Sequence, residues 1–97
     1  MLIIRVTAQF SEQNIQQALN ILQTLKRQTQ DIEGRQEYQI YIDPENPTLV
    51  VLYQVWTSQA DFDAYKSSND FIKMGASLAP LMTAMPKTDT FKAEQVS

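Results

Sequence analysis

The side chains best suited to chemistry lie in one segment, in which a strand ending at Trp56 runs directly into a helix carrying Tyr65 and Phe71. Trp56 could stack on a flat aromatic substrate, and Tyr65 could hydrogen-bond a substrate oxygen, because both side chains combine a large apolar ring with one polar group. The chain has no histidine and no cysteine, and the segment holds no evident nucleophile and base pair. Any reaction here would therefore depend on phenol, indole, amide or carboxylate groups, or on the reactivity of the substrate itself.

Each of these residues also has a structural interpretation. Trp56 could anchor its strand to the following helix, and Tyr65 could be half buried with its hydroxyl in water. Phe71 and Met74, with further apolar residues at helical spacing, could line a cavity for a ring system, because methionine adapts to varied shapes. The same spacing is typical of a helix packed on a sheet, and one cavity can serve both purposes.

A short polar row is the second candidate. Arg5, Thr7 and Gln9 lie on one side of the first predicted strand, and we expect Gln54 beside them on a neighbouring strand. These groups could hold a substrate carbonyl or activate a water; alternatively, they satisfy one another's hydrogen bonds, as buried polar groups must. No residue stands out as the general base, and no carboxylates have the spacing of a metal site. The residues that we predict to bind a substrate are Trp56, Tyr65, Phe71, Met74, Thr7 and Gln54.

Composition excludes several classes of function. A chain of 97 residues is long enough for one small domain, whose core a second chain would help to complete. A net charge of -3 with scattered Lys and Arg provides no basic surface for nucleic acid. The absence of Cys and His excludes disulfides, thiolate nucleophiles and imidazole bases. Arg5 interrupts the apolar start of the chain, which favours a strand over a signal peptide, and no stretch has membrane-spanning length. We therefore expect a cytoplasmic protein with no membrane or nucleic-acid partner.

Hydrophobic periodicity predicts the first half of the fold. Apolar side chains alternate from Leu2 to Phe10, which is typical of a strand. Ser11 then has the position of an N-cap before apolar residues at helical spacing, so we expect a helix that ends before Gly34. Alternation resumes from Arg35 to Asp43, and the sequence Asp43-Pro-Glu-Asn-Pro47 has the composition of a hairpin turn.

Capping residues predict the second half. Ser58, with Asp61 three residues later, resembles a capping box and should open a helix. We expect Ser67-Ser-Asn69 to interrupt this helix and Pro80 to divide its continuation, because proline lacks the backbone N–H. The last predicted strand is Lys87 to Glu94.

The third strand, Thr48 to Trp56, completes the order β-α-β-β-α-β. This order is the ferredoxin-like split βαβ fold, an α+β architecture whose antiparallel sheet carries its helices on one face. Residues 49–53 are apolar at consecutive positions and therefore on both sides of the sheet. The helices can cover one side only, so we expect a second copy to pack sheet against sheet in an obligate homodimer.

The order and spacing of Tyr53-x-x-Trp56, Ser58, an apolar residue at 62, an aromatic residue at 65, Ser68 and Phe71 resemble the antibiotic biosynthesis monooxygenase (ABM) domain family. Glu33-Gly34 and Asp43-Pro-x-x-Pro47 extend the resemblance, which covers about the whole chain. It implies a single ABM-like domain over residues 1–97, with its core over about 2–94. It also implies a dimeric α+β barrel built from two ferredoxin-like chains.

The resemblance implies a small cofactor-independent monooxygenase that acts on a phenolic, quinol or similar aromatic metabolite, with neither metal nor flavin. An electron-rich phenolate can pass an electron to oxygen itself, so the protein would bind, orient and deprotonate it. Members often have histidine where this chain has Tyr65 and Asp70, and the haem ligand of a haem-degrading branch would fall near Gly75, so haem degradation is disfavoured. The alternatives are a non-catalytic dimeric module that binds a small hydrophobic molecule, and a dimer that serves only as a scaffold.

Overall fold

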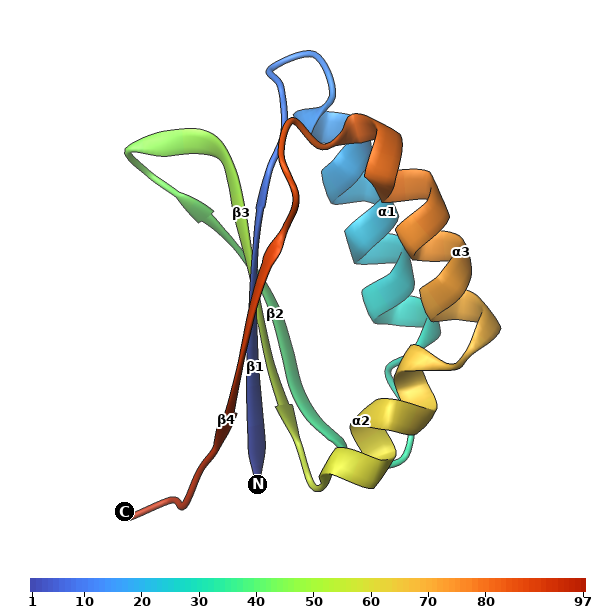
Figure 1. Cartoon of the computed structure of the whole chain (residues 1–97), viewed down its shortest axis with the longest axis vertical. Coiled ribbons are helices and arrows are strands. Elements are labelled where there is room, and N and C mark those ends of the chain that lie inside the picture. Colours follow the sequence, from blue (N-terminus) through green and yellow to red (C-terminus); the bar gives the residue numbers. More distant parts are fainter.

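Four strands form one antiparallel sheet, and three helices pack against one face of it (Figure 1). The computed structural model describes residues 1–97. The strands are β1 (Leu2–Gln9), β2 (Arg35–Asp43), β3 (Asn46–Trp56) and β4 (Lys87–Lys92), in the order β2-β3-β1-β4 across the sheet. The helices are α1 (Ile15–Gln28), α2 (Gln59–Lys66) and α3 (Asn69–Leu78), followed by the 3-10 turn η1 (Ala79–Leu81). The predicted ferredoxin-like α+β fold is confirmed.

Alternation in β1 and β3 separates the two faces of the sheet. In β1, Leu2, Ile4 and Ala8 are buried beneath the helices, whereas Arg5 is exposed on the opposite side. β3 runs antiparallel to β1, with Ile4 opposite Gln54. Because directly opposed residues share a face, the even-numbered residues of both strands point toward the helices. We call the helix-covered side the inner face and the other side the outer face.

α1 begins three residues later than predicted. Ser11 is not its cap: the Ser11 carbonyl accepts hydrogen bonds from the N–H groups of Asn14 (3.1 Å) and Ile15 (3.0 Å), which makes a turn before the helix. Asn14 takes the N-cap position without a side-chain cap bond. The helix ends at Gln28, and the residues that it buries against the sheet are Ala18, Leu22 and Leu25.

Two serines divide the next helical segment into α2 and α3. The Ser58 hydroxyl accepts a hydrogen bond from the Asp61 N–H (3.2 Å), and the Ser68 hydroxyl accepts one from the Phe71 N–H (3.3 Å). Each bond satisfies a donor that would otherwise lack a partner at the start of the helix. The predicted interruption is confirmed, although its last residue, Asn69, is the first residue of α3.

Short turns set the remaining boundaries. β2 and β3 join through a two-residue turn, where the Glu45 N–H donates to Asp43 Oδ1 (2.9 Å), so β3 begins at Asn46, two residues earlier than predicted. Pro80 lies in η1: α3 stops at Leu78, just before the proline, but the helical segment ends at Leu81 instead of continuing beyond it as predicted. β4 ends at Lys92 instead of Glu94.

Gly34 holds the start of β2 against α2. Its φ of +86° lies in the left-handed region, and a Cβ at this position would overlap the side chain of Asp61. The Gly34 carbonyl also accepts a hydrogen bond from the Thr57 N–H (2.8 Å), just before α2 begins. This close approach fixes one end of the helix layer on the sheet.

Two hydrophobic clusters fill the space between the sheet and the helices. One contains Phe10, Leu22 and Val50, and the other contains Trp56 and Tyr65 among its members. Partly buried Met74 packs against both clusters. None of the helices combines the length and hydropathy of a membrane span.

Candidate functional site

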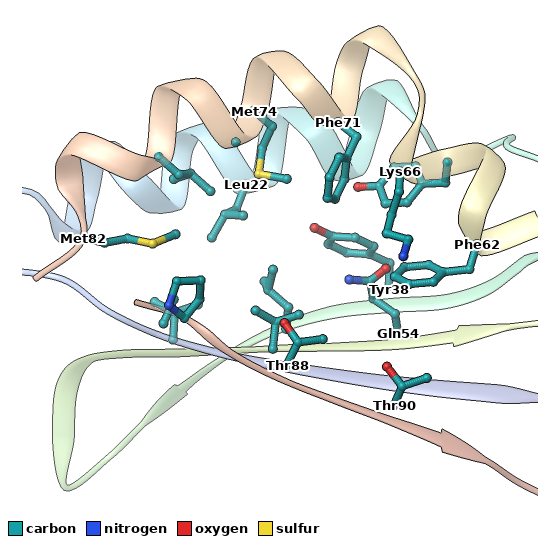
Figure 2. A pocket seen from close by; sticks show the side chains of 18 of the residues that line it. Leu22, Tyr38, Gln54, Phe62, Lys66, Phe71, Met74, Met82, Thr88 and Thr90 are labelled. Atoms are coloured by element: carbon teal, nitrogen blue, oxygen red, sulfur yellow. The ribbon is translucent and has the colours of Figure 1, made fainter. Parts of the chain in front are cut away.

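A cavity of about 380 Å³ lies between the inner face and the helix layer. This volume lies within the range of small-molecule pockets, which starts near about 300 Å³. Figure 2 shows Phe71 and Met74 pointing down from α3, and Gln54, Thr88 and Thr90 on the sheet side. The remaining lining residues are Val6, Ala8, Phe10, Leu22, Tyr38, Val50, Leu52, Phe62, Tyr65, Lys66, Gly75, Leu78, Met82 and Pro86.

The mouth of the cavity lies between the helix layer and β4. The solvent-exposed members of the lining are Lys66, Gly75, Pro86, Thr88 and Thr90, which come from these two sides. β4 is an edge strand, so no further strand closes the opening. Two threonine hydroxyls and one ammonium group therefore border the opening.

An aromatic group forms one end of the cavity. The rings of Trp56 and Tyr65 are stacked, with centroids 5.0 Å apart and planes at 27°, and Tyr65 meets Phe71 edge-on at 5.2 Å. Phe62 packs against Trp56 at 5.7 Å. Such contacts add to the stability from burial and restrict each ring to one orientation, so this end of the cavity is a stiff apolar wall.

Trp56 forms the back of this wall and fixes the orientation of Gln54. Its side chain is fully buried, and its Nε1–H donates to Gln54 Oε1 at 3.0 Å. A carboxamide has one acceptor and one donor end. With the acceptor end of Gln54 bound to the indole, its Nε2 donors remain for the cavity.

Two tyrosine hydroxyls in the lining, those of Tyr38 and Tyr65, are buried near each other, and neither has any other hydrogen-bond partner. Burial raises the pKa of Tyr38 to about 12. Burial, and then the nearby Tyr38, raises the pKa of Tyr65 even further. Both phenols are therefore neutral at physiological pH and are available as hydrogen-bond donors.

Arg35 makes a cation–π contact with the ring of Tyr38, and both residues belong to β2. Its guanidinium carbon lies 4.7 Å from the centroid of the Tyr38 ring. The same guanidinium donates to the carbonyl of Lys26 (2.9 Å), in the last turn of α1, and to the hydroxyl of Thr29 (3.0 Å), the residue that follows this helix. Because burial removes water from it, the pKa of Arg35 is lowered. Arg35 thus links α1 to the ring that lines the cavity.

Lys66 is the one charged residue of the lining. Its Nζ lies 4.9 Å from the centroid of the Phe62 ring and 3.5 Å from a carboxylate oxygen of Asp63. Figure 2 shows its side chain extending from α2 toward Phe62 and Gln54. Nowhere do three or more Asp or Glu side chains gather as a metal site would require.

Four of the six predicted substrate-binding residues line this cavity: Gln54, Tyr65, Phe71 and Met74. Trp56 lies behind the lining, and Thr7 pairs with Val51 on the outer face. Contact of any of the six with a substrate stays a prediction.

The expected position of Gln54 beside the polar row is wrong. Gln54 lies opposite Ile4 on the inner face, whereas Arg5, Thr7 and Gln9 lie on the outer face. On that face Arg5 forms an ion pair with Asp89 (2.9 Å), and the side chain of Gln9 is hydrogen-bonded to Thr48 and Asn46 at the start of β3, so these partners lie outside the row and not, as expected, within it.

Sequence reasoning did not identify the other polar groups of the lining. Tyr38 had a signal, because it alternates with Ile40 in β2 and so belongs to the inner face. Lys66, Thr88 and Thr90 had none, since their place at the mouth depends on how the helix layer sits on the sheet.

Comparison with known proteins agrees with this geometry. A solved structure of a candidate antibiotic biosynthesis monooxygenase from Deinococcus radiodurans superposes with a TM-score of 0.93 at 16% identity, covering 100% of this chain and 96% of the other. A similar candidate from Nitrosomonas europaea has a TM-score of 0.90 at 18% identity, over 96% and 98% of the two chains. A conserved protein from Methanosarcina mazei Go1 has a TM-score of 0.87 at 24% identity, over 97% and 95%.

At these identities the solved structures establish the fold alone. No protein with a curated description is significantly similar in sequence. The sequence model of the family described as antibiotic biosynthesis monooxygenase, however, matches residues 1–76, which include the strand and helices that build the aromatic wall. The chain belongs to the antibiotic biosynthesis monooxygenase (ABM) family.

Proposed function

We propose that this protein is a small monooxygenase that oxidises a phenolic, quinol or similar aromatic metabolite in the cavity, without a cofactor. The observation that carries the proposal is the cavity itself, which combines a stiff aromatic wall with the buried hydroxyls of Tyr38 and Tyr65. An aromatic ring fits the apolar walls, and its oxygen substituents fit the free donors. Membership of the ABM family supports the reaction class.

The chemistry asks little of the protein beyond binding and orientation. An electron-rich aromatic substrate supplies the electrons itself: one oxygen atom of O₂ is added to a substrate carbon, and two electrons and two protons from the substrate convert the other atom to water. The wall of Tyr65 and Phe71 would hold the ring in one plane, and the cavity would exclude bulk water from the reacting carbon.

We also propose that the chain works as a homodimer that packs through the outer face. The side chains of Tyr41 and Phe91 on this face are 52% and 47% exposed, and Val51 and Tyr53 lie between them on β3. All the helices lie on the other side of the sheet (Figure 1). A second copy of the same face is the simplest cover for these apolar side chains, and a symmetric dimer uses one patch twice.

Oxygen uptake tests the proposed reaction. Metal-free protein is mixed with a panel of hydroquinones and polycyclic phenols, and oxygen consumption is followed with an electrode. We expect consumption above that of buffer for at least one substrate, and a loss of at least about tenfold in kcat/KM on Phe71→Ala, since about 1.4 kcal/mol of transition-state binding corresponds to tenfold.

Ile72→Ala is the matched control, because Ile72 neighbours Phe71 on α3 but is 58% exposed and does not line the cavity. It should retain full activity. No acceleration over buffer with any substrate would refute the proposal, as would equal losses in the two variants. A ligand that raises the melting temperature without oxygen consumption would indicate binding alone.

A further inference from the structure

We propose that the cavity binds its aromatic ligand through an ionised oxygen, held by Gln54 and Lys66 with Tyr38 and Tyr65 as neighbouring donors. This inference rests on the cavity being the substrate site, and it specifies the charge of the substrate there. The preferred ligands are then phenolates, enolates and aromatic carboxylates. Neutral aromatic molecules of the same shape bind less well.

The first argument is that the four polar groups gather at one end of the cavity. Gln54 and Tyr38 lie directly opposite each other in the β2–β3 pair, on the inner face. Gln54 is bonded to Trp56, on which Tyr65 stacks. Lys66 follows Tyr65 in the chain, and its ammonium group lies over the ring of Phe62. Phe62 packs against the indole of Trp56. The side chains of Tyr38, Gln54 and Lys66 are seen at this end in Figure 2.

The second argument is that these groups have hydrogen-bond donors to offer a ligand. The Gln54 carbonyl is already bound by Trp56, which leaves its N–H groups. Tyr38 and Tyr65 are 3% and 2% exposed and stay protonated, and their hydroxyls interact only with each other, so the pair still has an O–H to donate. A buried donor without a partner costs free energy, and a ligand oxygen with free lone pairs removes that cost. An ionised oxygen is the strongest such acceptor.

The third argument concerns charge. No carboxylate lines the cavity, and the ammonium of Lys66 has only the exposed Asp63 near it, at 3.5 Å. Charges outside the lining include Arg35, whose guanidinium lies over the Tyr38 ring, and Asp70 at the start of α3, which acts weakly on Tyr65. On β4 the inner-face charge is Lys92, beyond Thr90. The one charge in the lining is therefore a cation, which favours the anionic form of a bound phenol.

The consequence is that the protein need not remove the proton of the phenol itself. A phenol that binds gives its proton to water, and the cavity holds the resulting phenolate. This is the electron-rich form that can reduce oxygen, so the protein would need no histidine or carboxylate base. The pH dependence of turnover should then follow the pKa of the bound substrate.

The test is a spectrophotometric titration of 4-nitrophenol, whose phenolate is coloured, in the presence of excess protein. We expect the pKa of the bound dye to be lower than that of the free dye by about one unit, a tenfold preference for the anion. Lys66→Met should abolish most of this shift. Lys73→Met is the control, since Lys73 is an exposed lysine of the adjacent helix and lies outside the cavity lining. Nitrobenzene serves as the neutral analogue.

A bound dye with an unchanged or raised pKa would overturn the inference. So would equal shifts in Lys66→Met and wild type, nitrobenzene binding as tight as that of the dye, or no dye binding below about 1 mM, the limit of weak affinity. Because the titration involves no oxygen, it separates the two proposals. A lowered pKa without oxygen uptake rejects the oxygenation alone, and oxygen uptake with an unshifted dye rejects the anionic binding alone.

Discussion

The two faces of the sheet are made by the same strands but have different surroundings. On β3, the inner side chains of Val50, Gln54 and Trp56 are buried by helices of the same chain. The outer side chains of Val51 and Tyr53 come from the same apolar run, yet no helix of the chain covers them. The inner face is therefore complete apart from a cavity, whereas the outer face still has apolar area to bury.

This difference shows how a short chain can combine a packed core with a cavity. The aromatic wall and the apolar cluster around Phe10 and Leu22 close the inner face at its two ends. The space that remains between them is the cavity, so the cavity is lined by the same side chains as the core. The outer face would contribute to stability through assembly. The four predictions below test this contrast, starting with the largest expected effect.

Removal of the inner wall should cause the largest loss of stability. Trp56→Ala should reduce the free energy of unfolding by about 3–5 kcal/mol, because it leaves a large cavity and frees the carbonyl of Gln54. Urea denaturation followed by circular dichroism measures this loss. Trp56→Phe retains most of the packing and should cost less. A loss below about 1 kcal/mol for Trp56→Ala would place this residue outside the essential core.

A charge on the outer face should break assembly and spare the fold. Val51→Lys places two ammonium groups in the proposed dimer interface, and we expect the dimer to weaken at least about 100-fold, since a buried unpaired charge costs several kcal/mol. Sedimentation velocity measures the oligomeric state, and circular dichroism checks the helices. Ile72→Lys, on the exposed side of α3, should leave the oligomeric state unchanged. A stable dimer of Val51→Lys would contradict assembly through the outer face.

Alkaline pH should distinguish the tyrosines of β2. Because burial raises the pKa of Tyr38 from 10.0 to about 12, its stabilising effect is fully present below pH 10 and is lost as pH rises toward 12, where the unfolded chain ionises first. Tyr38→Phe should therefore flatten the fall in the free energy of unfolding over this range. Tyr41→Phe, at a 52% exposed position on the outer face of the same strand, is the matched control variant. Both substitutions are best made in the Val51→Lys variant, because the outer face of that variant stays exposed to water. If the free energy of unfolding falls with pH equally in the two double variants, the tyrosines of both faces are shielded.

The exposed ion pair of the outer face should have the smallest effect. Arg5 lowers the pKa of the Asp89 carboxyl, so the contribution of the pair is present above the ordinary pKa of Asp and is lost as pH falls through the lowered value. Asp89→Asn at neutral pH and physiological salt should leave the melting temperature within experimental error, because solvent and salt screen exposed pairs. A clear fall in the melting temperature would show that the pair is shielded in the assembly.

The fold could be predicted because its signals are local. The alternation of apolar side chains predicted the bounds of β1 and β2 to within one residue, and the hydroxyls of Ser58 and Ser68 mark the starts of α2 and α3. Ser11 gave the same signal and was misleading. There the carbonyl, and not the hydroxyl, makes the bonds that lead into α1, and a sequence does not distinguish the two.

The site was harder to predict because it depends on pairing between distant residues. Gln54 was assigned to the wrong neighbours, since the register of β3 against β1 is a tertiary property. Its position two residues before Trp56 nevertheless places both on one face, and that signal lay within the strand. The threonines and Lys66 at the mouth reach the cavity only through the packing of the helix layer on β4.

Trp56 is the only tryptophan of the chain, and this makes it an optical reporter of the site. Its indole stacks on Tyr65, which lines the cavity, and its N–H donates to the side-chain amide of Gln54, which also lines it. A molecule that enters the cavity changes the polarity and the hydrogen bonding on this side of the indole, and a bound quinone would accept an electron from the excited ring. Occupancy of the cavity can therefore be followed by the intrinsic fluorescence of the unlabelled protein.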